Sequence, residues 1–161
     1  MRHPPFTWLV AAALLAAGCS RPAVESRPAQ QAPPAEATAI SWRHDLDAAL
    51  AQARGEGKPL MVDVFATWCS PCKRLDEEVF SRADVAHASR AFIPVKVDGD
   101  KHPDVLKKFA ISGYPTILFL SLQGQEIHRV RGAAPHQIML QEMAKAAEKA
   151  AATQAADAPG E

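Results

Sequence analysis

Hydrophobic positions between residues 45 and 150 follow two alternating patterns, one typical of helices and the other of buried strands. Helical spacing predicts helices over Asp45–Arg54, Ser70–Phe80 and Pro103–Phe109, a short helix opened by a capping box at Ser81–Asp84, and a last helix opened by Pro135. Continuous apolar runs predict strands at Leu60–Phe65 and Phe92–Val97, and a hairpin of Thr116–Leu120 and Glu126–Val130 around Gln123–Gly124.

This order of elements predicts an α/β fold with a mixed central β-sheet flanked by helices. The elements span residues 40–150, which is long enough for one domain with its own hydrophobic core, and we expect a monomer. Residues 151–161 are rich in alanine and end in Ala-Pro-Gly-Glu. We therefore expect the last helix to fray into a disordered C-terminal tail there.

Two segments without the pattern of a packed core precede the domain. The apolar stretch Phe6–Ala17 follows Arg2 and is shorter than the ~20 residues that a membrane-spanning helix needs. Residues 1–18 are therefore predicted to be a secretory signal peptide. Residues 19–39 are rich in proline, alanine and glutamine, which predicts a semi-extended tether.

The small residues before Cys19 resemble a bacterial lipobox. This resemblance implies that Cys19 is lipidated and becomes the mature N-terminus of a lipoprotein. Ala16 stands where that pattern usually has leucine, so ordinary cleavage after Ala11–Ala13 is the alternative, and either route exports the protein. We expect a periplasm-facing lipoprotein of the bacterial cell envelope. Ser20 is not an aspartate-type signal for inner-membrane retention, which favours the outer membrane.

The charge of the chain does not favour nucleic-acid binding. The chain carries 18 basic and 18 acidic side chains, which balance at pH 7. The two signs are interspersed, as in Lys73–Glu78, and such a run is typical of a solvated helix face. We therefore expect no nucleic-acid partner.

Cys69 and Cys72 carry the candidate chemistry. They lie three residues apart where the strand Leu60–Phe65 gives way to a helix, so they can close a reversible disulfide, and the N–H groups of the helix start favour a thiolate. The chain has 3 cysteines, and if Cys19 carries lipid only this pair is left, so there is no structural disulfide framework. Half of a zinc site is the alternative, but the 6 histidines show no ligand pair. We expect redox chemistry without metal or cofactor.

Three separated motifs make residues 40–150 resemble the thioredoxin-fold family. They are Val62-Asp63 with Trp68–Lys73, Val95–Asp98, and Gly113–Thr116 followed by Gly132. Within that family, Glu78–Ser81 and the later Gly-Tyr-Pro-Thr resemble the C-terminal periplasmic domain of the membrane disulfide reductase DsbD and its stand-alone relatives. The resemblance implies a thioredoxin fold and thiol–disulfide exchange.

The resemblance also implies four catalytic residues. Cys69 would be the exposed nucleophile that attacks a partner disulfide, and Cys72, one helical turn deeper, would resolve the mixed disulfide. Asp63 matches a buried acid that shuttles the proton of the second thiol, and burial would raise its pKa towards neutral. Lys96 matches a lysine near that acid, with a surface ion pair or a strand-end charge as the alternative.

Five further residues are implied to bind substrate. Pro115 matches a cis-proline that faces the disulfide and leaves the backbone of Tyr114 free to pair with an extended partner; Tyr114 stands where thioredoxin usually has an aliphatic residue. Trp68 is expected to cover the active site, with a half-buried core aromatic as the alternative. Ser70 and Pro71 separate the cysteines, and Pro71 stiffens the first turn of the helix.

These features predict an extracytoplasmic, membrane-anchored thiol:disulfide oxidoreductase. Ser70-Pro71 is close to the Gly-Pro of reducing thioredoxins, so we favour a reductase or electron relay. Such a protein needs a membrane electron donor because the periplasm is kept oxidising, and its partners would be envelope proteins with disulfides or thiols. The alternatives are a non-catalytic binding or assembly module with this fold, and a thiol peroxidase or sulfur-transfer protein.

Overall fold

A mixed four-stranded sheet forms the centre of the computed structural model, which describes residues 39–157. Its strands are β1 (Leu60–Phe65), β2 (Ile93–Asp98), β3 (Thr116–Leu120) and β4 (Glu126–Arg131), in the order β2-β1-β3-β4. Strand β1 pairs parallel with β2 and antiparallel with β3, and β4 is antiparallel to β3. The predicted α/β fold with a mixed central sheet is confirmed.

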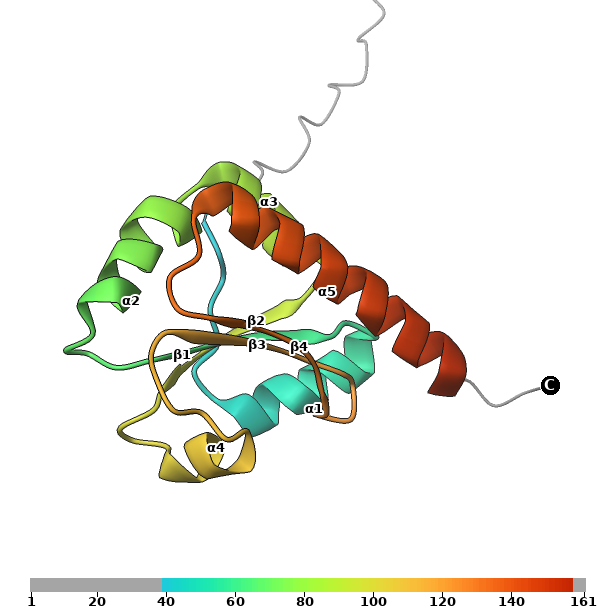
Figure 1. Ribbon diagram of the computed structural model, residues 1–161. Coiled ribbons are helices and arrows are strands. Elements are labelled where there is room, and N and C mark those ends of the chain that lie inside the picture. The colour runs from blue at the N-terminus through green and yellow to red at the C-terminus, as the bar shows by residue number, and fades with distance from the viewer. Residues whose placement is uncertain (1–38, 158–161) are drawn as a thin grey trace, which may run out of the picture. The chain divides into compact units, whose positions relative to one another are not determined.

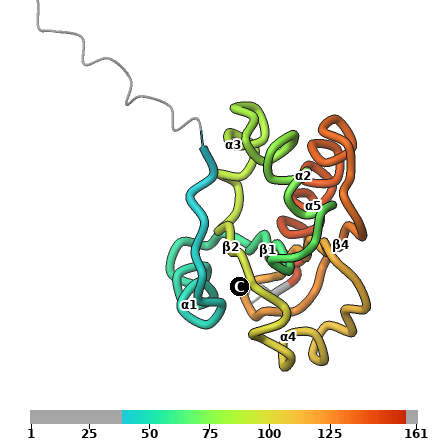
Figure 2. Tube along the Cα trace, turned by 90° about the vertical axis from the view of Figure 1, so that its left-hand side faces the viewer, coloured from blue at the N-terminus to red at the C-terminus, as the bar shows by residue number. Residues whose placement is uncertain are grey.

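Helices cover both faces of this sheet (Figure 1, Figure 2). On one face lie α1 (Leu46–Glu56) and α4 (Pro103–Lys108). On the other lie α2 (Ser70–Leu75), the π-helical turn η1 (Asp76–Phe80), α3 (Ala83–Ser89) and α5 (His136–Asp157). Strand β1 is therefore covered on both sides, which explains why its sequence is a continuous apolar run rather than an alternating one.

The two layers enclose separate hydrophobic clusters, and β1 contributes to both. Met61 packs with Phe119 and Met139 on the side of α2, α3 and α5, whereas Val62 and Val64 pack on the side of α1 and α4. Because side chains alternate along a strand, Asp63 faces the same side as Met61. The one charged residue of β1 is thus directed towards the layer that contains the cysteines' helix.

The segment before α1 runs beside the edge strand β2. The backbone N–H of Arg43 donates to the carbonyl of Pro94 at 2.9 Å, and the Arg43 carbonyl accepts from the N–H of Lys96 at 2.8 Å. These bonds cover part of an otherwise open sheet edge and bring the neighbouring Trp42 over the Lys96 ammonium group.

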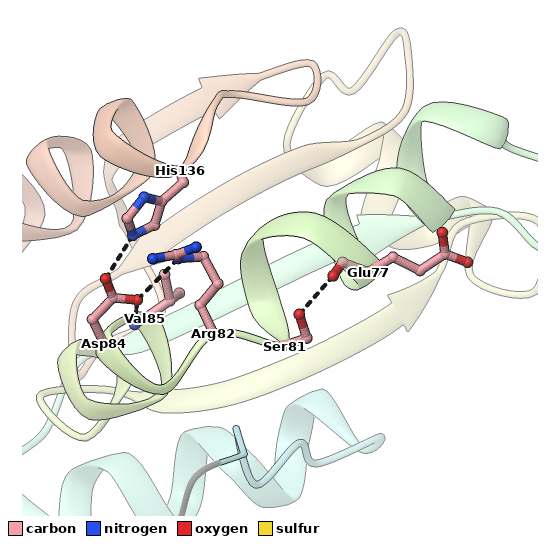
Figure 3. A network of polar contacts seen from close by, with 6 residues as sticks. All are labelled: Glu77, Ser81, Arg82, Asp84, Val85 and His136. Atoms are coloured by element: carbon pink, nitrogen blue, oxygen red, sulfur yellow. Dashed lines mark hydrogen bonds and ion pairs between the residues drawn. The ribbon is translucent and has the colours of Figure 1, made fainter.

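The predicted capping box at Ser81–Asp84 is wrong, although the short helix α3 does form there. The Ser81 hydroxyl donates instead to the Glu77 carbonyl at 2.6 Å, because Ser81 directly follows η1 and meets the open carbonyls of its last turn (Figure 3). Helix α3 then begins without a side-chain cap. The Asp84 carboxylate lies 2.7 Å from the imidazole of His136 at the start of α5 (Figure 3).

The C-terminal boundary also differs from the prediction. Helix α5 runs to Asp157, so the disordered tail expected over 151–161 is wrong for residues 151–157. Alanine has the highest helix propensity, and the side chain of Gln154 also reaches the Gly57 carbonyl, at 3.4 Å. The predicted signal peptide, Cys19 and all but the last residue of the predicted tether lie outside the described residues. Within 39–157, no helix is long and apolar enough to cross a membrane.

Candidate active site

Cys69 and Cys72 lie at the junction of β1 and α2 and are joined by a disulfide. Cys69 is the N-cap residue of α2, with extended backbone angles, and its sulfur accepts a hydrogen bond of 3.2 Å from the backbone N–H of Cys72. Pro71 occupies the first turn, where a missing N–H costs no helical hydrogen bond. In the reduced protein the same N–H and the helix dipole would stabilise a thiolate on Cys69.

The expectation of an exposed Cys69 is wrong. Cys69 and Cys72 are 3% and 4% exposed, and they form a buried cluster with Ala66 against which Phe65 and Tyr114 pack. The two differ in another respect, since Cys69 lines a surface groove of about 580 Å³ and Cys72 does not. Access to the pair is therefore through this groove and leads to Cys69.

The groove brings together residues from three separate segments. Its lining contains Trp68, Ser70 and Pro71 beside Cys69, and Leu106, Ile111, Ser112, Gly113 and Tyr114 from α4 and the loop after it. Sequence reasoning had selected Trp68, Ser70, Pro71 and Tyr114 but missed Leu106 and Ile111. Those two are ordinary apolar residues of a predicted helix and loop, and no sequence signal distinguishes them from core positions.

The loop before β3 has the cis peptide bond that the resemblance implied. This bond joins Tyr114 to Pro115, and the Tyr114 side chain packs against the cluster that contains the two cysteines. Pro115 itself is buried and lines a smaller hollow beside Arg129 and Arg131 rather than the main groove. Trp68 is 67% exposed, so the alternative of a half-buried core aromatic is wrong.

Asp63 is a buried carboxylate close to one cation. Only 2% of the residue is exposed, and its Oδ2 atom lies 3.2 Å from Lys96 Nζ. Burial raises the pKa of Asp63 to about 6, and the positive charge of Lys96 opposes that increase. The other carboxylate oxygen, Oδ1, makes no hydrogen bond within the described part of the chain. A group with such a pKa can take and release a proton near neutral pH.

Lys96 lies between two carboxylates and under aromatic rings, which excludes the alternative of an isolated surface pair. Its ammonium group also contacts Asp76 of η1 and lies 5.2 Å from the ring centroid of Trp42 and 5.1 Å from that of Phe65. Asp76 and Trp42 were missed by sequence reasoning. Asp76 belongs to a charged run that is typical of a solvated helix face, so only its position in space connects it with the buried pair.

The arrangement around the cysteines is suited to thiol–disulfide exchange. Among residues 39–157, no group of three or more histidine, cysteine, aspartate or glutamate side chains could hold a metal ion. The two sulfurs are bonded to each other, one of them faces a groove, and a carboxylate of raised pKa lies on the same side of the sheet. A partner dithiol that supplies two electrons and two protons could open this disulfide, and Asp63 could transfer one of those protons.

Residues 46–147 match the family of thioredoxin-like domains. A curated relative, the thiol:disulfide interchange protein DsbD of Klebsiella pneumoniae, is 40% identical over 93 residues, which cover 55% of this chain and 15% of that protein. The chain thus spans a small part of the length of this relative. The similarity is to one segment of a much larger protein.

Solved structures agree with the family match. A putative disulphide-isomerase from Bacteroides thetaiotaomicron has a TM-score of 0.62 and 35% identity, covering 68% of this chain and 94% of that one. A thioredoxin from Thermus thermophilus has a TM-score of 0.64 and 25% identity, covering 71% of this chain and 94% of that one. On its sequence match, its sheet order and its cysteine geometry, the chain belongs to the thioredoxin-like domain family, with similarity to DsbD.

Proposed function

We propose that this protein is an extracytoplasmic, membrane-anchored thiol:disulfide oxidoreductase that works as a reductase or electron relay. The observation that carries the proposal is the asymmetry of the cysteine pair, in which Cys69 alone lines the groove. A partner sulfur that enters the groove meets Cys69 first. Similarity of the chain to DsbD supports an envelope location, and the Ser70-Pro71 dipeptide supports electron flow in the reducing direction.

The first step is an attack by the Cys69 thiolate on one sulfur of a partner disulfide. The partner's S–S bond breaks, its second sulfur leaves as a thiolate, and a mixed disulfide joins Cys69 to the partner. In this state Cys72 still carries its proton and is shielded from the groove. Tyr114 packs against the cysteines and the loop before Pro115 lines the groove, so the partner chain would lie along this loop.

The second step releases the partner. Asp63 takes the proton of Cys72, for which a pKa of about 6 leaves it mostly ionised at neutral pH. The Cys72 thiolate then attacks Cys69 Sγ, the intermolecular S–S bond breaks, and the partner leaves reduced by two electrons after taking up two protons. The Cys69–Cys72 disulfide is restored to a dithiol by a membrane electron donor, which must supply the same two electrons and two protons.

The direct test of the proposal is reduction of insulin disulfides by the protein with dithiothreitol as the electron source. We expect wild-type protein to accelerate insulin precipitation and Cys69→Ser to leave it at the uncatalysed rate, because no other sulfur lines the groove. Cys19→Ser is the matched control, since it makes the same change at the cysteine that precedes the domain. Equal activity of wild type and Cys69→Ser would contradict the proposal and favour a non-catalytic binding module.

Anchoring is tested at Cys19, which we propose to carry the lipid. Cys19→Ala should leave the folded domain and its insulin activity intact, because residue 19 precedes the domain by the length of the proposed tether. The variant should be lost from the membrane fraction or remain unprocessed when envelope fractions are compared by immunoblot. A Cys19→Ala protein that is still processed and still fractionates with membranes would contradict lipidation and support ordinary signal-peptide cleavage.

A further inference from the structure

A second hollow adjoins the groove that contains Cys69, and it is lined by arginines. Its volume is about 150 Å³, and it shares residues 112–114 with the groove. Arg129 and Arg131 of the edge strand β4 also line it. Within residues 39–157, they are the only charged residues that line the groove or the second hollow. The exchange steps proposed above do not use them.

Strand pairing places Arg131 beside the loop that carries the cis peptide bond. Its partner in the β3–β4 ladder is Thr116, the residue directly after Pro115. The N–H of the next residue, Gly132, donates to the Pro115 carbonyl at 2.8 Å, which holds this end of β4 against the loop. Arg131 therefore lies next to residues 112–114, along which the partner chain is proposed to lie.

The two arginines differ in how far their charges are already neutralised. The Arg129 guanidinium forms an ion pair with Glu126 and donates to the Phe109 carbonyl at 2.7 Å, and only 13% of its side chain is exposed. Arg131 is exposed, and within the described part of the chain its guanidinium has neither an ion pair nor a side-chain hydrogen bond. Arg131 is therefore the cation of the second hollow that can bind a further anionic group.

The position of β4 in the sheet offers a plainer reason for a charge at this residue. Strand β4 pairs with β3 on one side only, and charged side chains on an edge strand oppose pairing with a second sheet. A charge at many places along β4 would serve that role, and it would create no preference among partners. The location of Arg131 in a hollow that shares residues with the Cys69 groove favours a role in binding.

We propose that Arg131 is a specificity-determining residue that pairs with an aspartate or glutamate side chain of the partner, a few residues from the reacting cysteine. This inference rests on the proposed function. A partner chain that reaches Cys69 and lies along residues 112–114 continues into the second hollow, and each extended residue advances it by about 3.3 Å. A carboxylate within about four residues of the cysteine would then meet the guanidinium, which can bind both of its oxygens. A basic side chain at the same place would be repelled.

The test uses three disulfide-linked peptides that differ only at the positions near the cysteine, which hold glutamate, glutamine or lysine. Wild type should prefer the glutamate peptide to the glutamine peptide by about threefold in kcat/KM, mainly through KM, because an exposed ion pair adds binding rather than chemistry. Arg131→Gln should bring the two values within about 1.5-fold of each other. Arg131→Glu should reverse the order, so that the lysine peptide becomes the best substrate. At about 0.5 M salt the wild-type preference should disappear, because exposed charges are screened.

Two controls separate partner recognition from general effects. Arg54→Glu makes the same change of net charge beside the β3–β4 turn, at the other end of β4, and should keep the wild-type order of the peptides. Hydroxyethyl disulfide is uncharged, so all variants should reduce it at the wild-type rate. An unchanged preference in Arg131→Gln would overturn the inference and leave Arg131 with the edge-strand role, and a parallel loss of activity on hydroxyethyl disulfide would overturn it too. If wild type reduces hydroxyethyl disulfide but treats the three peptides alike, only this inference fails; if it reduces none of these disulfides, the proposed function fails and takes this inference with it.

Discussion

Replacing Cys72 with serine should cause covalent adducts between the protein and its partners to accumulate. Cys69 can still attack a partner disulfide through the groove, but a serine hydroxyl cannot displace the partner's sulfur from the mixed disulfide. In non-reducing gels of envelope extracts, we expect new bands of higher mass that collapse with dithiothreitol. Turnover of insulin should fall to the uncatalysed rate in the same variant.

The matched controls are Cys69→Ser and the double variant, neither of which should form adducts. Adducts of equal strength from Cys69→Ser would reverse the roles of the two cysteines, a result that the burial of both sulfurs makes worth testing. Absence of adducts from every variant would instead argue for a binding module without turnover. Alkylation of wild-type cells then reports direction, and we expect mostly dithiol with the electron donor present and mostly disulfide after its deletion.

Asp63→Asn should stabilise the oxidised protein at neutral pH while slowing release of its partners. In the wild type, burial raises the pKa of Asp63 from 3.8 to about 6, so the folded state holds this proton more tightly than the unfolded state does. Asp63 therefore makes its full contribution to the free energy of unfolding below the pKa that it has in the unfolded chain. This contribution is lost as pH rises through about 6. An amide does not ionise, so the variant avoids that loss.

Urea unfolding at pH 4 and pH 7.5 checks the effect. The difference in unfolding free energy between Asp63→Asn and wild type should increase in favour of the variant by on the order of 2 kcal/mol between these pH values. Asp47→Asn, which changes an exposed carboxylate of α1, is the control and should show no comparable increase. A difference that is the same at both pH values would show that Asp63 gains no proton affinity on folding.

Asp63→Asn should also lower the rate of the second chemical step, in which Cys72 resolves the mixed disulfide. Without a carboxylate to take the Cys72 proton, resolution of the mixed disulfide should slow by on the order of 100-fold at neutral pH. Stopped-flow mixing of the reduced protein with excess disulfide-linked peptide separates attack, whose rate rises with peptide concentration, from release, whose rate does not. If release is as fast in Asp63→Asn as in wild type, another group or water accepts the proton.

Most of the fold followed from local pattern. The strands Leu60–Phe65 and Thr116–Leu120 have the predicted bounds, because burial of both faces demands apolar residues throughout. The cysteine pair was also readable, since a Cys-x-x-Cys at a strand-to-helix junction needs only short-range geometry. Asp63 is one acid in an apolar run, but its expected role in proton transfer came from the family resemblance rather than from local pattern. Predictions failed at Ser81–Asp84, where the Ser81 hydroxyl donates to a carbonyl instead of accepting from a helix N–H, and at the end of α5, where an alanine-rich helix continued.

Tertiary structure alone decided what surrounds these residues. Asp76 and Trp42 meet Lys96, and Leu106 and Ile111 line the groove, only because distant segments fold against one another. A solvated-looking aspartate and an ordinary leucine carry no local mark of such a contact. Packing around the cysteine pair likewise left Cys69 buried, against expectation. The sequence by itself therefore determined which atoms can react. The three-dimensional packing decided from which side a partner reaches them and which groove residues it contacts, because exposure and groove shape depend on contacts between residues far apart in the chain.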